Sequence, residues 1–268
     1  MDYDFSDLIS AYKKLDISDS DVILVFTDLR YLGRYHDLKL PSVCEAHYSA
    51  ILECSRKQSL EPTIAVNTST TYICNTSQVY DPDVAKSERG LFTNYVRGLS
   101  GAIRSLHPFQ SFTALGPKAK NICQKNTRYG FGPNSPMARM LELKTRVLSI
   151  GLPPNETATV VHHVEQLMAV PYRYTKEFTH SIKQAGATKQ QLFYLFVNYR
   201  EARPKKDRNR KLLKNFEKRN GPILQVPVGR GSIFSYDLKA LFDSMIEDFS
   251  NDIYVALSQP PVIRPYQK

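Results

Sequence analysis

Two short β-branched apolar runs, each preceded by a helical pattern, constrain the fold of this chain more than any other feature. The runs are Val22–Phe26 and Thr63–Asn67. Apolar residues recur at helical spacing from Leu8 to Leu15 before the first run and from Cys44 to Gln58 before the second. Strands with few polar residues are buried on both faces, and alternation of helices with strands favours parallel pairing. The sequence therefore predicts an α/β fold with an at least partly parallel sheet.

Similar patterns extend along the rest of the chain. We expect further helices at residues 90–99, 117–125, 137–143 and 237–249. We expect further strands at residues 111–115, 146–150, 157–161, 172–178, 191–198 and 223–227. No internal repeat or long low-complexity linker divides the sequence. We therefore expect one domain over residues 1–268, with a smaller lobe at about 172–235 as an alternative division.

The sequence carries no signal for membrane insertion or secretion. No stretch approaches about 18 uninterrupted apolar residues, and the N-terminus lacks the basic and apolar segments of a signal peptide. We expect a soluble cytoplasmic protein without a membrane partner. The four cysteines stand singly, without CxxC or zinc-finger spacing, which predicts buried free thiols.

The formal net charge of +10 is concentrated in one basic tract. Residues 203–219 hold nine lysines and arginines against two acidic residues, so they carry most of the excess. A positive field favours anionic partners such as phosphates and nucleotides, and it disfavours polycations. A solvated helix face is the alternative explanation, since Leu212, Leu213 and Phe216 would anchor one side of such a helix. The tract has little aromatic interleaving and matches no nucleic-acid motif, so we expect no nucleic-acid partner.

The segment Thr159–Glu165 is the strongest candidate for chemistry. A strand ending at His162 and turning into a helix would place His162 and Glu165 at positions i and i+3, on one face. A carboxylate on one imidazole nitrogen fixes the tautomer and leaves the other nitrogen as a base. A structural histidine is the plainer alternative. A metal site with His163 is disfavoured, because adjacent strand residues point to opposite sides.

Two further segments could line a binding site. Arg104–Ser111 combines a guanidinium, an imidazole and two hydroxyls just before a strand, where α/β folds place ligands. Asn67–Thr71 places hydroxyls directly after a strand. Ordinary hydrogen-bonded turns are the alternative for both segments. The chain has no glycine-rich phosphate loop and no GxSxG elbow, so neither a nucleotide-loop enzyme nor a serine hydrolase is indicated.

Taken together and in order, these segments resemble the aminoglycoside 3-N-acetyltransferase family over roughly Asp21 to Tyr174. The matching segments are Pro62–Tyr72, Tyr80-Asp81, Ser87-Glu88-x-Gly90, the R-S-x-H-P-x-x-S run Arg104–Ser111, Gly116 with Ala119, Gly130–Pro136, Leu148–Gly151 and the T-x-x-H-x-x-E run Thr159–Glu165. Two positions depart from the family pattern. Phe26-Thr27-Asp28-Leu29 replaces the usual HSSL-like sequence, and Asn67 stands where proline is usual.

The resemblance implies a three-layer α/β/α fold with a mixed sheet, unrelated to the commoner GNAT acetyltransferases. It implies direct acyl transfer from acyl-CoA in a ternary complex, with His162 as general base and Glu165 as its orienting carboxylate. Thr68 and Ser105 resemble residues near the thioester. The residues implied to bind acyl-CoA are Arg104, Ser105, His107 and Ser111. The residues implied to bind the acceptor are Asp81, Tyr172 and Arg173.

The net charge of +10 guides the choice of acceptor. A basic protein repels polycationic aminoglycosides, so we expect a nucleotide-linked (dTDP or UDP) amino-dideoxy sugar as the acceptor. Aminoglycoside 3-N-acetylation is the alternative within the family, and a basic nucleic-acid-binding protein is the alternative from another class. A covalent route through Cys74 rivals direct transfer. We expect no metal cofactor, and a homo-oligomer stays open.

Overall fold

The computed structural model describes residues 2–40, 42–56, 61–124, 127–202, 204 and 208–267. At its centre lies a seven-stranded mixed sheet with the order β10-β11-β7-β2-β4-β6-β5. Its three central strands are parallel: β7 (Thr145–Ile150), β2 (Val22–Thr27) and β4 (Thr63–Asn67). Antiparallel strands complete both edges, namely β5 (Ile103–Arg104), β6 (Phe112–Leu115), β10 (Leu224–Val228) and β11 (Gly231–Asp237).

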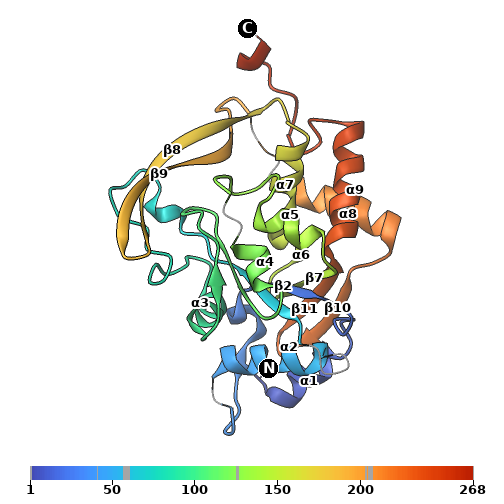
Figure 1. Cartoon of the computed structure of the whole chain (residues 1–268). Helices are drawn as coiled ribbons and strands as arrows, with labels where there is room; N and C mark the ends of the chain where they lie inside the picture. The colour runs from blue at the N-terminus through green and yellow to red at the C-terminus, as the bar shows by residue number, and fades with distance from the viewer. Residues whose placement is uncertain are drawn as a thin grey trace.

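Helices cover both faces of this sheet. The face packed against α1 (Phe5–Tyr12), α2 (Val43–Ser55) and α3 (Leu91–Gly98) receives Ile23 and Val25 of β2. The opposite face receives Val22 and Leu24 and packs against α4 (Ala119–Cys123), α5 (Pro136–Leu141), α7 (Val160–Leu167), α8 (Arg208–Asn220) and α9 (Leu238–Asn251). Successive side chains of a strand point to opposite faces, so one apolar strand supplies both cores. Figure 1 shows the two helical layers on either side of the sheet, which confirms the predicted α/β/α fold.

A long hairpin leaves the three-layer body. Its strands β8 (Arg173–Gln184) and β9 (Ala187–Asn198) form a separate two-stranded sheet, drawn in yellow and orange in Figure 1. They are joined through Ala185 and Gly186, which both have positive φ, as tight hairpin turns require. Ile182 and Phe193 anchor the hairpin in a small apolar cluster with Tyr80. Within the lobe suggested at 172–235, the hairpin is separate, whereas β10 and β11 belong to the large sheet.

Small elements complete the described chain. They are β1 (Asp2–Tyr3) paired with β3 (Arg34–Tyr35), helix α6 (Pro154–Thr157) and the 3-10 turns η1 (Leu29–Leu32), η2 (Thr71–Ile73) and η3 (Pro265–Gln267). No helix among the described residues is long and apolar enough to span a membrane. All four cysteines are unpaired, as predicted, but only Cys44 and Cys123 are buried, whereas Cys54 and Cys74 are partly exposed.

The predicted strand at 157–161 is wrong. Thr157 ends α6, and Val160 begins α7, so this β-branched run is helical. Val160, Val161 and Val164 are all buried in the core that also contains α9 residues. Their packing as one helical face outweighs the weak preference of valine for strands. The structure also contains β5 and β11, which the sequence patterns did not indicate.

Gly116, in the turn between β6 and α4, packs closely against the start of β4. Its φ is +127°, and an added Cβ would lie 2.8 Å from both the Pro62 carbonyl oxygen and the Thr63 Cα. Gly116→Ala should therefore lower the free energy of unfolding by at least about 1–2 kcal/mol, the usual cost of left-handed backbone for L-residues. Urea denaturation measures this loss.

Gly98 is the matched control for that substitution. It ends α3, and nothing lies within 4 Å of the position that an added Cβ would take. Gly98→Ala should leave stability unchanged or raise it by up to about 1 kcal/mol, because alanine restricts the unfolded chain. Equal stabilities of the two variants would contradict the close approach at Gly116.

Candidate active site

His162 and Glu165 lie one helical turn apart on α7, which places them on the same face. The Nδ1 atom of His162 is 3.4 Å from Oε2 of Glu165. The Glu165 side chain is completely buried, whereas 36% of the His162 side chain is exposed. The proximity predicted from the sequence is therefore present, and it arises inside one helix rather than at a strand end.

His162 stands where two cavities meet. The first has a volume of about 380 Å³ and the second of about 580 Å³, and both include His162, Gln110 and Phe131 in their walls. The rest of the first wall is Val25, Phe26, Thr27, Asn67, Ser69, Thr71, Arg89, Thr93, Leu152, Glu156, Thr157 and Thr159. The rest of the second wall is Arg173, Phe196, Val197, Asn198, Pro204 and Arg208. One imidazole is thus accessible from two adjoining spaces.

The carboxylate of Glu165 is held by three further side chains. Arg173 Nη2 lies 2.7 Å from Oε2, and Arg208 Nη1 lies 3.3 Å from Oε1. The hydroxyl of Tyr172 donates to Oε1 at 3.0 Å. Burial pushes the pKa of Glu165 upward, but the contact with His162 and the two guanidinium charges outweigh it, so the pKa lies below its usual value. Glu165 is therefore an ionised buried carboxylate.

The surroundings also set the protonation state of His162. Burial lowers its pKa, the contact with Glu165 partly offsets this effect, and the charges of Arg208 and Arg173 lower the pKa further. The imidazole is consequently neutral near pH 7. With Nδ1 directed at the carboxylate, Nε2 is the nitrogen that can accept a proton.

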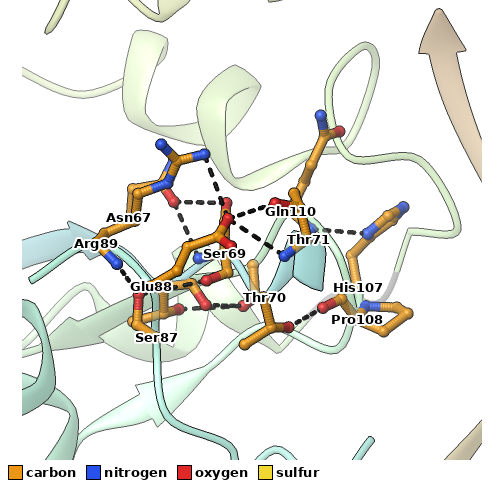
Figure 2. A network of polar contacts seen from close by, with 12 residues as sticks. Asn67, Ser69, Thr70, Thr71, Ser87, Glu88, Arg89, His107, Pro108 and Gln110 are labelled. Carbon is orange, nitrogen blue, oxygen red and sulfur yellow. Dashed lines mark hydrogen bonds and ion pairs between the residues drawn. The ribbon is translucent and has the colours of Figure 1, made fainter. Parts of the chain in front are cut away.

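Polar groups after β4 form the network of contacts drawn in Figure 2, and Asn67, Ser69 and Thr71 line the first cavity. The side-chain oxygen of Asn67 accepts hydrogen bonds from the amide of Ser69 at 3.0 Å and from its hydroxyl at 2.6 Å. Oε1 of Glu88 accepts hydrogen bonds from the Thr71 amide at 3.2 Å and from the Thr71 hydroxyl at 2.5 Å. The same oxygen lies 3.5 Å from Arg89 Nη2. The polar residues Asn67–Thr71 therefore make hydrogen bonds within their own turn, and some of them also line the first cavity.

The arginine predicted to bind acyl-CoA lies behind this wall. Arg104 donates from Nε to the Ser111 hydroxyl at 3.0 Å and from Nη2 to the Thr68 carbonyl at 2.5 Å. Its Nη1 donates to the carbonyls of Ala85 at 2.6 Å and Pro82 at 3.2 Å. The Thr68 side chain is fully buried, 3.1 Å from the Ser111 hydroxyl. These groups support the wall, and their direct contact with acyl-CoA remains a prediction.

Ser105 and His107 have similar supporting positions. The Ser105 hydroxyl accepts from the Phe112 amide at 2.9 Å. His107 is buried, with Nε2 3.2 Å from the Tyr194 carbonyl and Nδ1 accepting from the Gln110 amide at 3.1 Å. His107 thereby holds Gln110, a residue of both cavity walls. Acyl-CoA binding by Ser105 and His107 also remains a prediction.

The residues predicted to bind the acceptor separate into two places. Tyr172 and Arg173 both contact Glu165, and Arg173 lines the second cavity. Asp81 instead forms an ion pair of 2.9 Å with Lys183 on the hairpin and lines neither cavity. Its position supports a role in anchoring the hairpin rather than in holding an acceptor beside His162.

Several wall residues were not singled out from the sequence. Gln110 and Phe131 lie in loops, within the segments Arg104–Ser111 and Gly130–Pro136, but neither was assigned a role. Arg208 lies in the basic tract, where nothing distinguishes it from its neighbours. His163 is buried, and its Nδ1 accepts from the Gly132 amide at 3.1 Å. Among the residues that the structure describes, no three histidine, cysteine, aspartate or glutamate side chains group as metal ligands would.

The fold and site define a three-layer α/β/α protein with a histidine–glutamate pair between two cavities. Residues 48–250 match the family described as aminoglycoside 3-N-acetyltransferase. Because this match covers most of the sequence, the chain belongs to the aminoglycoside 3-N-acetyltransferase family.

Individual relatives match over a shorter region. Aminoglycoside N(3)-acetyltransferase IX of Micromonospora chalcea is 38% identical over 94 residues, which is 34% of this chain and 33% of the relative. Aminoglycoside N(3)-acetyltransferase VIII of Streptomyces fradiae is 37% identical over 95 residues, again 34% of this chain and 33% of the relative. The matched region thus spans about a third of the length of these curated relatives.

Solved structures match over nearly the whole chain. Sisomicin-bound AAC-VIa has a TM-score of 0.78 at 20% identity, covering 94% of this chain and 99% of that one. The binary complex of AAC-IIIb with CoASH has a TM-score of 0.78 at 18% identity, covering 97% of this chain and 100% of that one. At such low identity these likenesses show that the fold is shared.

Buried neutral histidines should make the protein sensitive to mild acid. Burial lowers the pKa of His47 to about 3 and those of His107 and His163 to about 4. The unfolded chain takes up protons near pH 6.5 while the folded chain does not, so stability is full above pH 6.5 and falls toward pH 4. Each histidine contributes up to about 1.4 kcal/mol per pH unit in this window.

Urea unfolding at pH 7.5 and pH 5.5 measures the effect. His47→Phe removes one of the three groups, so its stability should fall less steeply between these pH values. Equal free energies of unfolding for the unaltered chain at both values would contradict the assignment of neutral buried imidazoles.

Proposed function

We propose that this protein is an acyl-CoA-dependent N-acyltransferase that acylates an amine of an amino sugar, with His162 as its general base. The observation that carries this proposal is the position of His162, which contacts a buried carboxylate through Nδ1 and lies between two cavities. Two adjoining cavities suit two substrates that react directly. Family membership supports the reaction class, and a relative of the same fold binds CoASH.

The site residues account for the proton movements of such a transfer. The amine nitrogen attacks the thioester carbonyl carbon while Nε2 of His162 accepts a proton from that nitrogen. The tetrahedral intermediate then collapses by breaking the C–S bond, and the imidazolium returns its proton to the departing sulfur, which yields an amide and the thiol of CoA. Glu165 stabilises the imidazolium that forms transiently. Its two arginine contacts keep it ionised and fixed in position.

Direct transfer is favoured over a covalent route through Cys74. That thiol is part-buried, and burial raises its pKa, so little thiolate is present near neutral pH. Cys74 also lies outside both cavity walls. Intact-mass measurement after incubation with acetyl-CoA alone should show no added acetyl group.

Two acceptors have support of different kinds. The named relatives are aminoglycoside N(3)-acetyltransferases, and one neighbour in fold binds sisomicin, so an aminoglycoside amine is the better-supported acceptor. The nucleotide-linked amino sugar expected from the net charge is the second candidate. It is supported by the net charge of +10 and by the wall arginines Arg89, Arg173 and Arg208, each of which also contacts a carboxylate, Glu88 or Glu165.

The described part of the basic tract has the structure expected for a solvated helix face. Leu212, Leu213 and Phe216 are buried on α8, as a helix anchored on one side requires. Arg219 pairs with Asp248 at 2.7 Å, so this charge is partly neutralised within the protein. Arg203, Lys205, Lys206 and Asp207 lie outside the described residues.

Acceptor choice is tested by release of free CoA thiol from acetyl-CoA. Sisomicin, kanamycin and dTDP- or UDP-linked amino sugars are compared at equal concentration. Acceptor-dependent release with either class supports N-acylation, and the larger kcat/KM identifies the acceptor. Absence of acceptor-dependent release with amines of both classes would contradict the proposed function.

His162→Asn tests the base directly. Asparagine keeps a similar shape but does not accept a proton, so kcat should fall by at least about 10²-fold. CoA affinity should change little, because the proton transfer occurs after binding. His36→Asn is the matched control, since His36 is exposed and lines neither cavity. Near-normal turnover of His162→Asn would remove this residue from the mechanism.

A further inference from the structure

We propose that Arg173 and Arg208 form a binding site for a phosphate group of a substrate in the second cavity. This site rests on the proposed function in one respect: the second cavity is taken to hold a substrate. The phosphate belongs either to the diphosphate of CoA or to a diphosphate carried by the acceptor. Both sources present the same diphosphate group, and titration with CoA and with UDP distinguishes them.

The first support is an imbalance of buried charge. Two guanidinium groups contact the single carboxylate of Glu165, with side chains 8% exposed for Arg173 and 15% exposed for Arg208. Glu165 is completely buried, and His162 is neutral near pH 7. Among the described residues that contact Glu165, one positive charge is therefore left over. Buried charges are ordinarily paired, so a cavity beside this excess charge favours an anion.

The second support is a hydrogen-bond donor without a partner in the wall of the second cavity. Arg173 uses Nη2 for Glu165 and Nη1 for the Phe196 carbonyl at 2.8 Å, but its buried Nε has no hydrogen-bond partner among the described residues. A buried donor without a partner costs about 1–3 kcal/mol, which a bound ligand can recover.

The third support is the geometry of the cavity itself. Arg208 lines it, and in the described structure its guanidinium contacts Glu165 through Nη1 alone. Arginine presents a planar fork of donors that matches two phosphate oxygens. The volume of about 580 Å³ accommodates a diphosphate, and the same wall includes His162. A phosphate bound here would lie in the same cavity as the proposed base.

Binding of inorganic pyrophosphate to the full chain tests the site without requiring turnover. Arg208→Gln should weaken pyrophosphate binding by at least about 10-fold, since a charge-assisted hydrogen bond contributes roughly 1.5–3 kcal/mol. The matched control is Arg210→Gln, which removes the same charge from an exposed position on α8 outside the second cavity. It should change the dissociation constant by no more than about twofold, the scale of a general field effect.

A second pair of variants serves if Arg208→Gln fails to fold. Asn198→Asp keeps the side-chain shape but adds a negative charge in the cavity wall, and it should also weaken pyrophosphate binding by at least about 10-fold. Asn75→Asp adds the same charge at an exposed position outside the cavity and should bind as the unaltered chain does.

The source of the phosphate follows from titrating the same variants with CoA and with UDP. Selective loss of CoA affinity in Arg208→Gln and Asn198→Asp assigns the site to the donor, and selective loss of UDP affinity assigns it to the acceptor. Equal pyrophosphate affinity in each variant and its control would overturn the site. A chain that binds pyrophosphate as expected but releases no CoA thiol with any amine would instead overturn the proposed function alone.

Discussion

The buried carboxylate of Glu165 is the interaction on which the site depends. It joins three elements: α7, which carries it, the following strand β8 through Arg173, and the more distant helix α8 through Arg208. Removing one partner of such a buried ionic cluster typically costs about 3–5 kcal/mol, because the remaining charge is left uncompensated. The same contacts fix His162 at the junction of the two cavities. Stability and site geometry are therefore consequences of one set of ion pairs.

The layered fold was predictable because it depends on local patterns. The run Val22–Phe26 is apolar throughout, which indicates in the sequence that both faces of the strand are buried, and its side chains do alternate between two helical layers. The closeness of His162 to Glu165 was predictable as well, because a spacing of three residues brings side chains together in any helix. The secondary structure of residues 157–161 was not, because the valines there form a helix through contacts with distant parts of the chain.

The remaining site residues were beyond the reach of local patterns for a related reason. Gln110 and Phe131 reach the cavities through loop paths that only the assembled layers determine. Arg208 is one of many cations in its tract, and its contact with Glu165 depends on how α8 packs. The net charge of +10 led to the expectation of a nucleotide-linked acceptor, which stays a proposal, whereas the named relatives support an aminoglycoside acceptor.

The hairpin is connected to the candidate active site at the residue where it begins. β8 starts at Arg173, next to Tyr172, and both residues hold Glu165. Further along β8, Lys183 is tied to Asp81 outside the cavities. The strand that begins the hairpin thus also supplies a guanidinium to the carboxylate that contacts His162. Contacts that hold the base of the hairpin and contacts that orient the imidazole are therefore shared.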